Sequence, residues 1–389
     1  MNSNYKNNFN KIHYDRINFM LPKGCKEQIR KHAESKNMSM NEYIWSAILK
    51  DMHTSDSLQT TDISNRRYVG SKQSLLPFIK NALQNIHFNS FADLFAGTGI
   101  VANAFNNNKR NIITNDILYS NYLCHYAWFS NYNYDESKIR NILIQYNSIV
   151  PDMKNYVTEI YGDKYFSQEN ASKIGCIRDN IETLKNNGAV NKREYALLIM
   201  SLLYAAQRAD ISRTVGHYMS FLKKPKPDGK LELQLPLAPY PDTNKGNQCY
   251  NIDAMNLIQT MPSVDLIYID PPYQRQYGEY YHVLENIALW KKEPTFGTTK
   301  RIHTPKSQFS IKRTATKAFA ELIQQCCNKT KYILISDNND NMNHIRNIDI
   351  MEILSEYSKV RVFTIDYPVF HGSKKNYDNK ERLFLCKIK

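Results

Sequence analysis

The sequence predicts an α/β fold, in which apolar strands alternate with helices, preceded by a small strand-helix-helix module. The α/β pattern begins with a strand over 90–95, a glycine turn, a helix over 100–105 and a second strand over 111–115. After a long helical insert, the apolar runs VDLIYID (264–270) and KYILIS (331–336) return as further strands. Strands separated by helices in this way indicate a sheet covered by helices.

The other elements follow from apolar periodicity. A helix is expected over 72–86, and the insert over 121–246 is rich in tyrosine and in helical periodicity. The remaining expected elements are helices at 137–149, 167–185, 192–207 and 284–290, a helix from 316, and two closing strands, VRVFTIDYP and RLFLCKI. We therefore assign 66–389 to one large domain, 53–65 to a polar linker and 12–52 to the amino-terminal module.

The charge balance favours a polyanionic partner. Lys and Arg number 51 against 37 Asp and Glu, and the resulting net charge of +14 favours nucleic acid. The seven cysteines are scattered without CxxC spacing, which indicates neither a metal site nor a disulfide framework but free thiols in a reducing bacterial cytoplasm. No signal-peptide core opens the chain, and the longest apolar run, 196–206, is too short to span a membrane.

Residues 15–52 have the pattern of a strand followed by two helices. Residues 16–20 alternate polar and apolar, as a short strand does, and Ser39 with Glu42 forms a capping box that opens the second helix. So few residues bury too little surface to be stable alone. The module resembles the ribbon-helix-helix fold, whose members pair their single strands in a homodimer and insert the two-stranded ribbon into the major groove.

In that fold the outward-facing strand residues contact the bases. The resemblance implies DNA-binding roles for Arg16, Asn18 and Met20, although Met20 departs from the usual polar side chain. The alternative is a helical adaptor that packs on the larger domain. A homodimer joined through this module is expected only on the first interpretation.

The first chemical signal is the segment DLFAGTGI. A strand that ends in Asp93 and continues through Phe95, Gly97 and Gly99 into a helix lets the backbone approach a ligand closely, because the two glycines have no side chain. Asp116 ends the next strand, where a carboxylate can accept hydrogen bonds from both hydroxyls of a ribose. The third glycine of a dinucleotide site is missing, which argues against NAD and favours another nucleotide-like ligand.

The second signal is IYIDPPYQ, which places Asp270, Pro271, Pro272 and Tyr273 at the carboxyl end of a buried strand. The prolines stiffen the turn, and both Asp270 and the Pro271 carbonyl can accept hydrogen bonds from a planar amino group. Holding both protons draws the nitrogen toward sp3 geometry and exposes its lone pair to a sulfonium methyl group. Tyr273 can stack on a base. Orientation and electrostatics then supply the rate without a metal or a covalent intermediate.

These motifs, in this order, resemble the Dam-like alpha-class family of N6-adenine DNA methyltransferases, and two further segments extend the resemblance. RRYVGSKQSLLPFI (66–79) resembles the segment before the first strand in that family, and YNIDAM lies shortly before the catalytic strand. The family implies that Tyr68 and Lys72 hold the methionine end of S-adenosyl-L-methionine. Asp253 would accept from the adenine amine of this cofactor, with Asp270 beside it.

The resemblance implies a Rossmann-like S-adenosylmethionine-dependent methyltransferase domain with a helical insert. The expected function is methyl transfer to the exocyclic amine of a flipped adenine in double-stranded DNA, in a restriction-modification system or as an orphan methylase. Two alternatives stay open: the same fold acting on the N4 of cytosine, an RNA base or a protein glutamine, and a ribbon-helix-helix regulator whose large domain has lost activity. The first group more often carries Ser or Asn in place of Asp270, and the intact DPPY argues against the second.

Two basic segments are candidate DNA contacts. In the family the insert holds the target-recognition region, where this sequence offers Arg208, Arg213, His217, Lys223 and Lys224. For His217 taken alone, a structural histidine is the favoured alternative. The stretch KRIHTPKSQFSIKR, which begins with Lys300 and Arg301, follows the catalytic turn and is expected to grip phosphates around the flipped base, with a solvated loop as the alternative.

Overall fold

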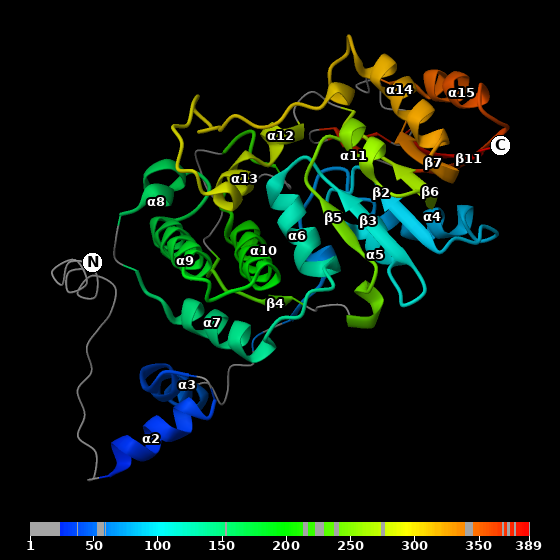
Figure 1. Ribbon diagram of the computed structural model, residues 1–389. Helices are drawn as coiled ribbons and strands as arrows, with labels where there is room; N and C mark the ends of the chain where they lie inside the picture. The colour runs from blue at the N-terminus through cyan, green and yellow to red at the C-terminus, as the bar shows by residue number, and fades with distance from the viewer. Residues whose placement is uncertain are drawn as a thin grey trace. The chain divides into compact units, whose positions relative to one another are not determined.

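The computed structural model describes residues 24–36, 38–52, 58, 60–151, 154–212, 217–221, 229–236, 241–273, 277–338, 345–367, 369–371, 374–376 and 379–388. The chain divides into two compact units, Met1–Ser57 and Leu58–Lys389 (Figure 1). Within these described ranges no helix is long and apolar enough to cross a membrane.

The first unit contains helices α2 (Cys25–Glu34) and α3 (Met40–Met52). The capping box predicted at the start of α3 is present, because the Ser39 amide donates to Glu42 Oε2 at 2.7 Å and the Glu42 amide donates to Ser39 Oγ at 3.2 Å. The strand expected at 16–20 lies outside the described residues, and so do its three candidate DNA contacts, Arg16, Asn18 and Met20.

These two helices leave much of their apolar surface uncovered. Ala33 of α2 is buried, whereas Trp45 and Ile48 of α3 are 37% and 38% exposed.

The second unit is built on a seven-stranded sheet with the order β5-β3-β2-β6-β7-β11-β8. Its strands are β2 (Ser90–Asp93), β3 (Asn111–Asn115), β5 (Gln248–Tyr250), β6 (Val264–Ile269), β7 (Thr330–Asn338), β8 (Val360–Asp366) and β11 (Lys380–Lys387). The first five strands in the order pair in parallel, and β11 lies antiparallel between β7 and β8. The α/β fold class predicted from the sequence is confirmed.

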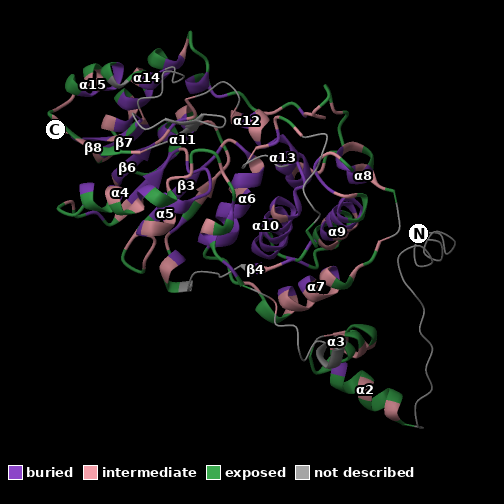
Figure 2. Cartoon of the chain, turned by 180° about the vertical axis from the view of Figure 1, so that it is seen from behind, coloured by how far each residue is buried: buried purple, intermediate pink, exposed green. Residues whose placement is uncertain are grey.

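Helices cover both faces of the sheet, and the strand side chains alternate between two hydrophobic cores with the period of two that a strand dictates. Phe91 and Leu266 belong to one core, and their neighbours Ala92 and Ile267 belong to the other. In Figure 2 these cores appear as the buried parts of strands and helices. The first core takes residues from α4 (Leu76–Ala82) and α5 (Ile100–Phe105), and the second from α11 (Ala254–Thr260), α14 (Ala315–Cys327) and α15 (Asn347–Ser355).

The insert adds helices to the first core. Its helices are α6 (Tyr119–Phe129), α7 (Glu136–Ser148), α8 (Tyr156–Tyr161), α9 (Gln168–Asn186) and α10 (Lys192–Ala209). The three helices expected here correspond to α7, α9 and α10. Helix α10 holds the longest apolar run of the sequence, and it is buried on almost every side against α6, α9 and α13 (His282–Leu289).

Two sequence expectations differ from the structure at their edges. The helix expected over 72–86 is a 3-10 turn, η2 (Gln73–Leu75), followed by the shorter α4. We expected a linker over 53–65, but the last residues of this stretch belong to the second unit. Strand β1 (Thr60–Thr61) pairs with β4 (Leu235–Pro236), and Ile63 is 1% exposed. A polar average composition hid the one isoleucine that anchors this stretch in the core. The sheet is accompanied by a small ribbon of β9 (Val369–His371) and β10 (Lys374–Asn376).

Candidate active site

The acidic residues predicted to act chemically gather at the carboxyl ends of neighbouring parallel strands. Asp93 ends β2, Asp116 directly follows β3, and Asp270 directly follows β6. The order of strands reverses at this place, because the chain proceeds from β2 outward to β3 and β5 on one side and then to β6 and β7 on the other. A crevice outside such a reversal is the usual ligand site of an open α/β sheet.

The glycine turn has the backbone conformation that its sequence predicts. Gly97 and Gly99 adopt positive φ angles of 53° and 80°. A Cβ atom on Gly97 would lie 3.1 Å from the ring of Tyr68, so the turn and this ring approach each other as closely as a glycine permits. The Gly97 carbonyl is fixed from the other side by His125 Nε2 at 2.9 Å. The turn therefore offers backbone rather than side chains to a ligand.

Asp116 is buried and already engaged by the protein. Its Oδ2 accepts hydrogen bonds from the Gly97 amide at 3.0 Å and from the Tyr277 hydroxyl at 2.6 Å, and its Oδ1 accepts one from the Leu118 amide at 2.9 Å. The Tyr68 hydroxyl donates in turn to the Tyr277 hydroxyl at 2.7 Å. Burial raises the pKa of Asp116. The structure links the two predicted residues Asp116 and Tyr68 through Tyr277, which was not among the candidates named from the sequence.

Asp270 lies beside Lys72, which precedes the first strand of the sheet by some distance in the sequence. Lys72 Nζ is 2.9 Å from Asp270 Oδ2 and 3.6 Å from Glu381 Oε1. Burial raises the pKa of Asp270 to about 6, while the Lys72 ammonium acts against this rise and Glu381 adds to it. The resemblance implied that Lys72 holds the cofactor, and the structure pairs it with Asp270, the carboxylate predicted to be catalytic. Glu381, a residue of β11 that is 1% exposed, was missed.

The rest of the DPPY turn is fixed from β7. The Tyr273 hydroxyl donates to the carbonyl of Ser336, and Ser336 Oγ donates to Glu381 Oε1 at 2.6 Å. Pro271 is buried and Pro272 is half-buried. Asp337 follows Ser336 on β7, and burial, with the charges of Glu381 and Asp270, raises its pKa to about 8. The DPPY turn thus lies among the carboxyl groups of Asp270, Asp337 and Glu381, with the Lys72 ammonium beside two of them.

The remaining residues predicted to bind the cofactor lie at or just after the end of β2 and at the start of α11. Asp93 is buried, burial raises its pKa, and its Oδ1 has no hydrogen-bond partner in the part of the chain that the structure describes. Phe95 meets Phe309 edge to face at 5.0 Å, and Asp253 caps α11 by accepting from the Met255 amide at 2.8 Å. An unsatisfied buried acceptor beside a glycine cradle fits a ligand with hydrogen-bond donors.

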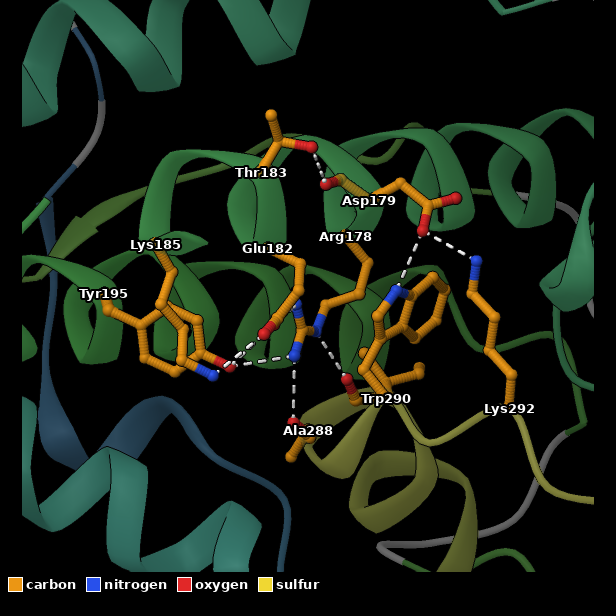
Figure 3. A network of polar contacts seen from close by, with 10 residues as sticks. Arg178, Asp179, Glu182, Thr183, Lys185, Tyr195, Ala288, Trp290 and Lys292 are labelled. Atoms are coloured by element: carbon orange, nitrogen blue, oxygen red, sulfur yellow. Dashed lines mark hydrogen bonds and ion pairs between the residues drawn. The ribbon is translucent and has the colours of Figure 1, made fainter. Parts of the chain in front are cut away.

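A buried arginine ties the insert to α13, the helix that follows the catalytic turn. Arg178 of α9 is fully buried and donates to the carbonyls of Ile287 at 2.8 Å and Ala288 at 3.1 Å, at the end of α13 (Figure 3). It also donates to Tyr195 and pairs with Glu182, both at 2.8 Å. This residue was not among the candidates named from the sequence.

The other side of α13 reaches the segment after Asp116. Glu285 accepts from the amides of Tyr119 at 2.9 Å and Ser120 at 2.8 Å, at the start of α6. The hydrogen bonds of Arg178 and Glu285 therefore connect α9, α13 and the segment that follows Asp116.

The candidate DNA contacts of the insert are only partly described. Arg208 donates to Gln234 Oε1 at 2.7 Å and to the Glu232 carbonyl at 2.8 Å, and His217 packs on Tyr280 with ring centroids 5.7 Å apart. These contacts give both residues a role within the fold. The other three candidates of the insert, Arg213, Lys223 and Lys224, lie outside the described residues.

The basic stretch over 300–313 lines one side of a cavity of about 730 Å³, here called the basic hollow. Phe296 and Arg301 exchange two backbone hydrogen bonds of 2.9 Å across a tight turn that holds Lys300 at a φ of 54°. Arg301 Nη1 pairs with Glu279 Oε2 at 2.5 Å. Tyr277 forms part of the wall, so the hollow adjoins the crevice at Asp116. Its basic lining residues are Arg301, His303, Lys306, Lys312 and Arg313.

A mostly parallel sheet with this reversal of order, a glycine turn after β2, an acidic residue after β3 and DPPY after β6 defines an S-adenosylmethionine-dependent methyltransferase that acts on an amino group. The family model for the D12 class N6 adenine-specific DNA methyltransferase matches residues 68–347. The chain belongs to this family: it is an adenine-specific DNA methyltransferase that uses S-adenosylmethionine.

Curated relatives support this assignment. The chain is 31% identical over 320 residues to the type II methyltransferase M.NlaIII of Neisseria lactamica, which covers 79% of this chain and 93% of the relative. It is 34% identical to the modification methylase StsI of Streptococcus sanguinis over 347 residues, which cover 83% of this chain and 52% of that protein. It is 29% identical to the type II methyltransferase M.CviAII of Paramecium bursaria Chlorella virus 1, over 82% of this chain and 98% of the relative.

Proposed function

We propose that Asp270 and the Pro271 carbonyl hold the amino group of a flipped adenine in double-stranded DNA, and that Tyr273 stacks on its base. The observation that carries this proposal is the pairing of Asp270 with Lys72 at 2.9 Å. Burial alone favours the neutral acid, which accepts hydrogen bonds poorly, and the ammonium favours the carboxylate. Lys72 thus acts as a positioning residue that keeps the acceptor ionised.

The cofactor supplies an electrophilic methyl group when it is bound. We propose that the protein's part is to fix the ribose with Asp116, to leave the backbone at Gly97 and Gly99 free of side chains, and to enclose the site with Phe95. Tyr68 lies against Gly97, and the unpartnered Asp93 Oδ1 is an acceptor for a ligand donor. Asp253 is the half-exposed residue directly before α11, and we propose that it accepts a hydrogen bond from the adenine amine of the cofactor.

We propose that the basic hollow binds the phosphates of the DNA strand beside the flipped base. Lys306, Lys312 and Arg313 form no ion pair with any other described residue, so their charges are available to phosphates. Arg301 is paired with Glu279 and orients the loop, while Lys300 stands in the turn. In the insert, Arg208, Arg213, His217, Lys223 and Lys224 remain the proposed target-recognition residues.

The amino-terminal unit is proposed to be a ribbon-helix-helix module, residues 12–52, that joins two chains and contacts DNA through Arg16, Asn18 and Met20. The capping box at Ser39 and the exposed Trp45 and Ile48 support this proposal, because a module of two helices has apolar surface to bury in a homodimer. The relatives are named type II methyltransferases and modification methylases, which favours a restriction-modification role in the bacterial cytoplasm over an orphan methylase.

Asp270→Ala tests the proposed catalytic role. Loss of an orienting acceptor should lower methyl transfer by a factor of at least about 100, with the fold and cofactor affinity retained. Methylated adenine in DNA from an unmethylated host, measured by mass spectrometry of a nucleoside digest, gives the rate and also detects methylated cytosine. Near-normal turnover by the variant would exclude the mechanism, and methylated cytosine from the unaltered protein would place the reaction on the wrong base.

A further inference from the structure

The hydrogen bonds at Asp116 leave too few acceptor positions for a ribose. A carboxylate has about four lone-pair sites. Three are taken: Gly97 and Tyr277 donate to Oδ2, and Leu118 donates to Oδ1. The two neighbouring hydroxyls of a ribose need two acceptor sites on the same carboxylate.

Tyr277 is the one donor of the three that can leave. The amides of Gly97 and Leu118 are backbone groups of the turns that follow β2 and β3, so they cannot move without rearranging those turns. The Tyr277 hydroxyl is at the end of a side chain, on a four-residue helix, α12 (Tyr277–Tyr280), shortly after the catalytic turn. The Tyr277 hydroxyl also accepts hydrogen bonds from the Tyr68 hydroxyl at 2.7 Å and from Asn121 Nδ2 at 3.1 Å. These two hydrogen bonds hold it at Asp116.

We propose that Tyr277 competes with the cofactor for Asp116: its hydroxyl satisfies the carboxylate in the cofactor-free protein and leaves when the ribose binds. This inference rests on the proposed role of Asp116 as the ribose acceptor. Because Tyr277 also forms part of the wall of the basic hollow, its departure changes that wall. Cofactor binding is thereby coupled to DNA binding, and the coupling is reciprocal.

Calorimetric titration with S-adenosylmethionine tests the competition through affinity, without any turnover. Tyr277→Phe should bind the cofactor about 10-fold more tightly, the lower end of what a hydrogen bond to a charged group contributes. Asp116→Asn should bind it at least about 10-fold more weakly on the same ground. In the double variant, the gain from Tyr277→Phe should vanish, because the contested carboxylate is absent.

Tyr281→Phe is the matched control. Tyr281 stacks on Tyr68 at 4.4 Å and exchanges hydrogen bonds with the backbone of Val69, one helical turn beyond Tyr277, but it makes no hydrogen bond to Asp116. This variant should not tighten binding. Equal or weaker cofactor binding by Tyr277→Phe, with weaker binding by Asp116→Asn, would overturn the competition and make Tyr277 a support for Asp116. Unchanged binding by Asp116→Asn would instead show that the proposed role of Asp116 is wrong, and the competition with it.

The coupling has a second readout. Binding of a random-sequence DNA duplex, followed by fluorescence anisotropy at fixed salt, should change in affinity when S-adenosylhomocysteine saturates the unaltered protein. In Tyr277→Phe this ratio of affinities should move toward 1, because the ring is no longer held at Asp116 before the cofactor binds. An unchanged ratio in the variant, or a ratio of 1 in the unaltered protein, would remove the link between the hollow and the cofactor site.

Discussion

Replacing Lys72 by Met should move the acid limb of the pH profile to higher pH. Asp270 acts as an ionised acceptor, and burial raises its pKa to about 6 although Lys72 opposes that rise. A raised carboxyl pKa means that the active, ionised form is present above it and is lost as the pH falls through it. Without the ammonium, that loss should begin at a higher pH.

The separation of the two groups sets the size of this shift. The charged atoms lie 2.9 Å apart, and the two side chains are 13% and 18% exposed. An opposite charge at such a distance lowers a carboxyl pKa by about 1–3 units. A shift of about 2 units would take the ionised fraction at pH 7 from about nine-tenths to about one-tenth, a loss of roughly 10-fold in rate.

The assay is kcat/KM for DNA at saturating cofactor from pH 5 to 9, because this parameter reports the groups of the cofactor-bound enzyme before it binds DNA. Saturation separates the shift from any loss of cofactor affinity. Lys331→Met is the matched control, since Lys331 Nζ pairs with Asp265 Oδ1 at 2.8 Å away from the crevice, and its profile should be unchanged. An acid limb that stays in place or moves to lower pH in Lys72→Met would refute the argument.

Three other changes have distinct expected outcomes. Tyr273→Phe loses the bond to the Ser336 carbonyl and keeps its stacking, so kcat/KM should stay above that of Tyr273→Ala, which also loses a stacking contact of about 1–3 kcal/mol. Arg178→Met leaves two helix-end carbonyls without a donor and should lower the free energy of unfolding by about 3 kcal/mol in urea titrations. Lys185 pairs with the same Glu182 as Arg178, at 2.8 Å, but is half-exposed, so Lys185→Met should lower the free energy of unfolding by no more than about 1 kcal/mol. Deletion of residues 1–57 should leave a monomer in sedimentation that still transfers methyl groups and binds DNA with a shallower salt dependence; a monomeric full-length protein would refute the proposed dimer.

The features that the sequence predicted are those written in short contiguous segments. The glycine turn and DPPY each follow a strand within a few residues, so their position at the sheet edge follows from the strand itself. Asp116 was found for the same reason, because it ends the next strand.

The features that were missed depend on contacts between distant segments. Glu381 meets Lys72 only because β11 runs antiparallel between β7 and β8, which puts its amino end at the catalytic edge. An acidic residue at the start of an apolar closing strand was the available signal. Arg178 offered another, since it stands on the same helical face as Ile174 and Ile181, where an apolar residue is expected. Tyr277 gave no such signal among 27 tyrosines.

The charges at Asp270 come from both ends of the second unit's sequence. Lys72 precedes the first strand of the sheet, and Glu381 belongs to its last strand in the chain, so the ribosome delivers them almost at opposite ends of synthesis of this unit. Until β11 has emerged, β7 and β8 have no strand between them, and the ammonium has one carboxylate instead of two. A chain truncated before β11 therefore carries the DPPY turn without Glu381 and without the strand that joins β7 to β8.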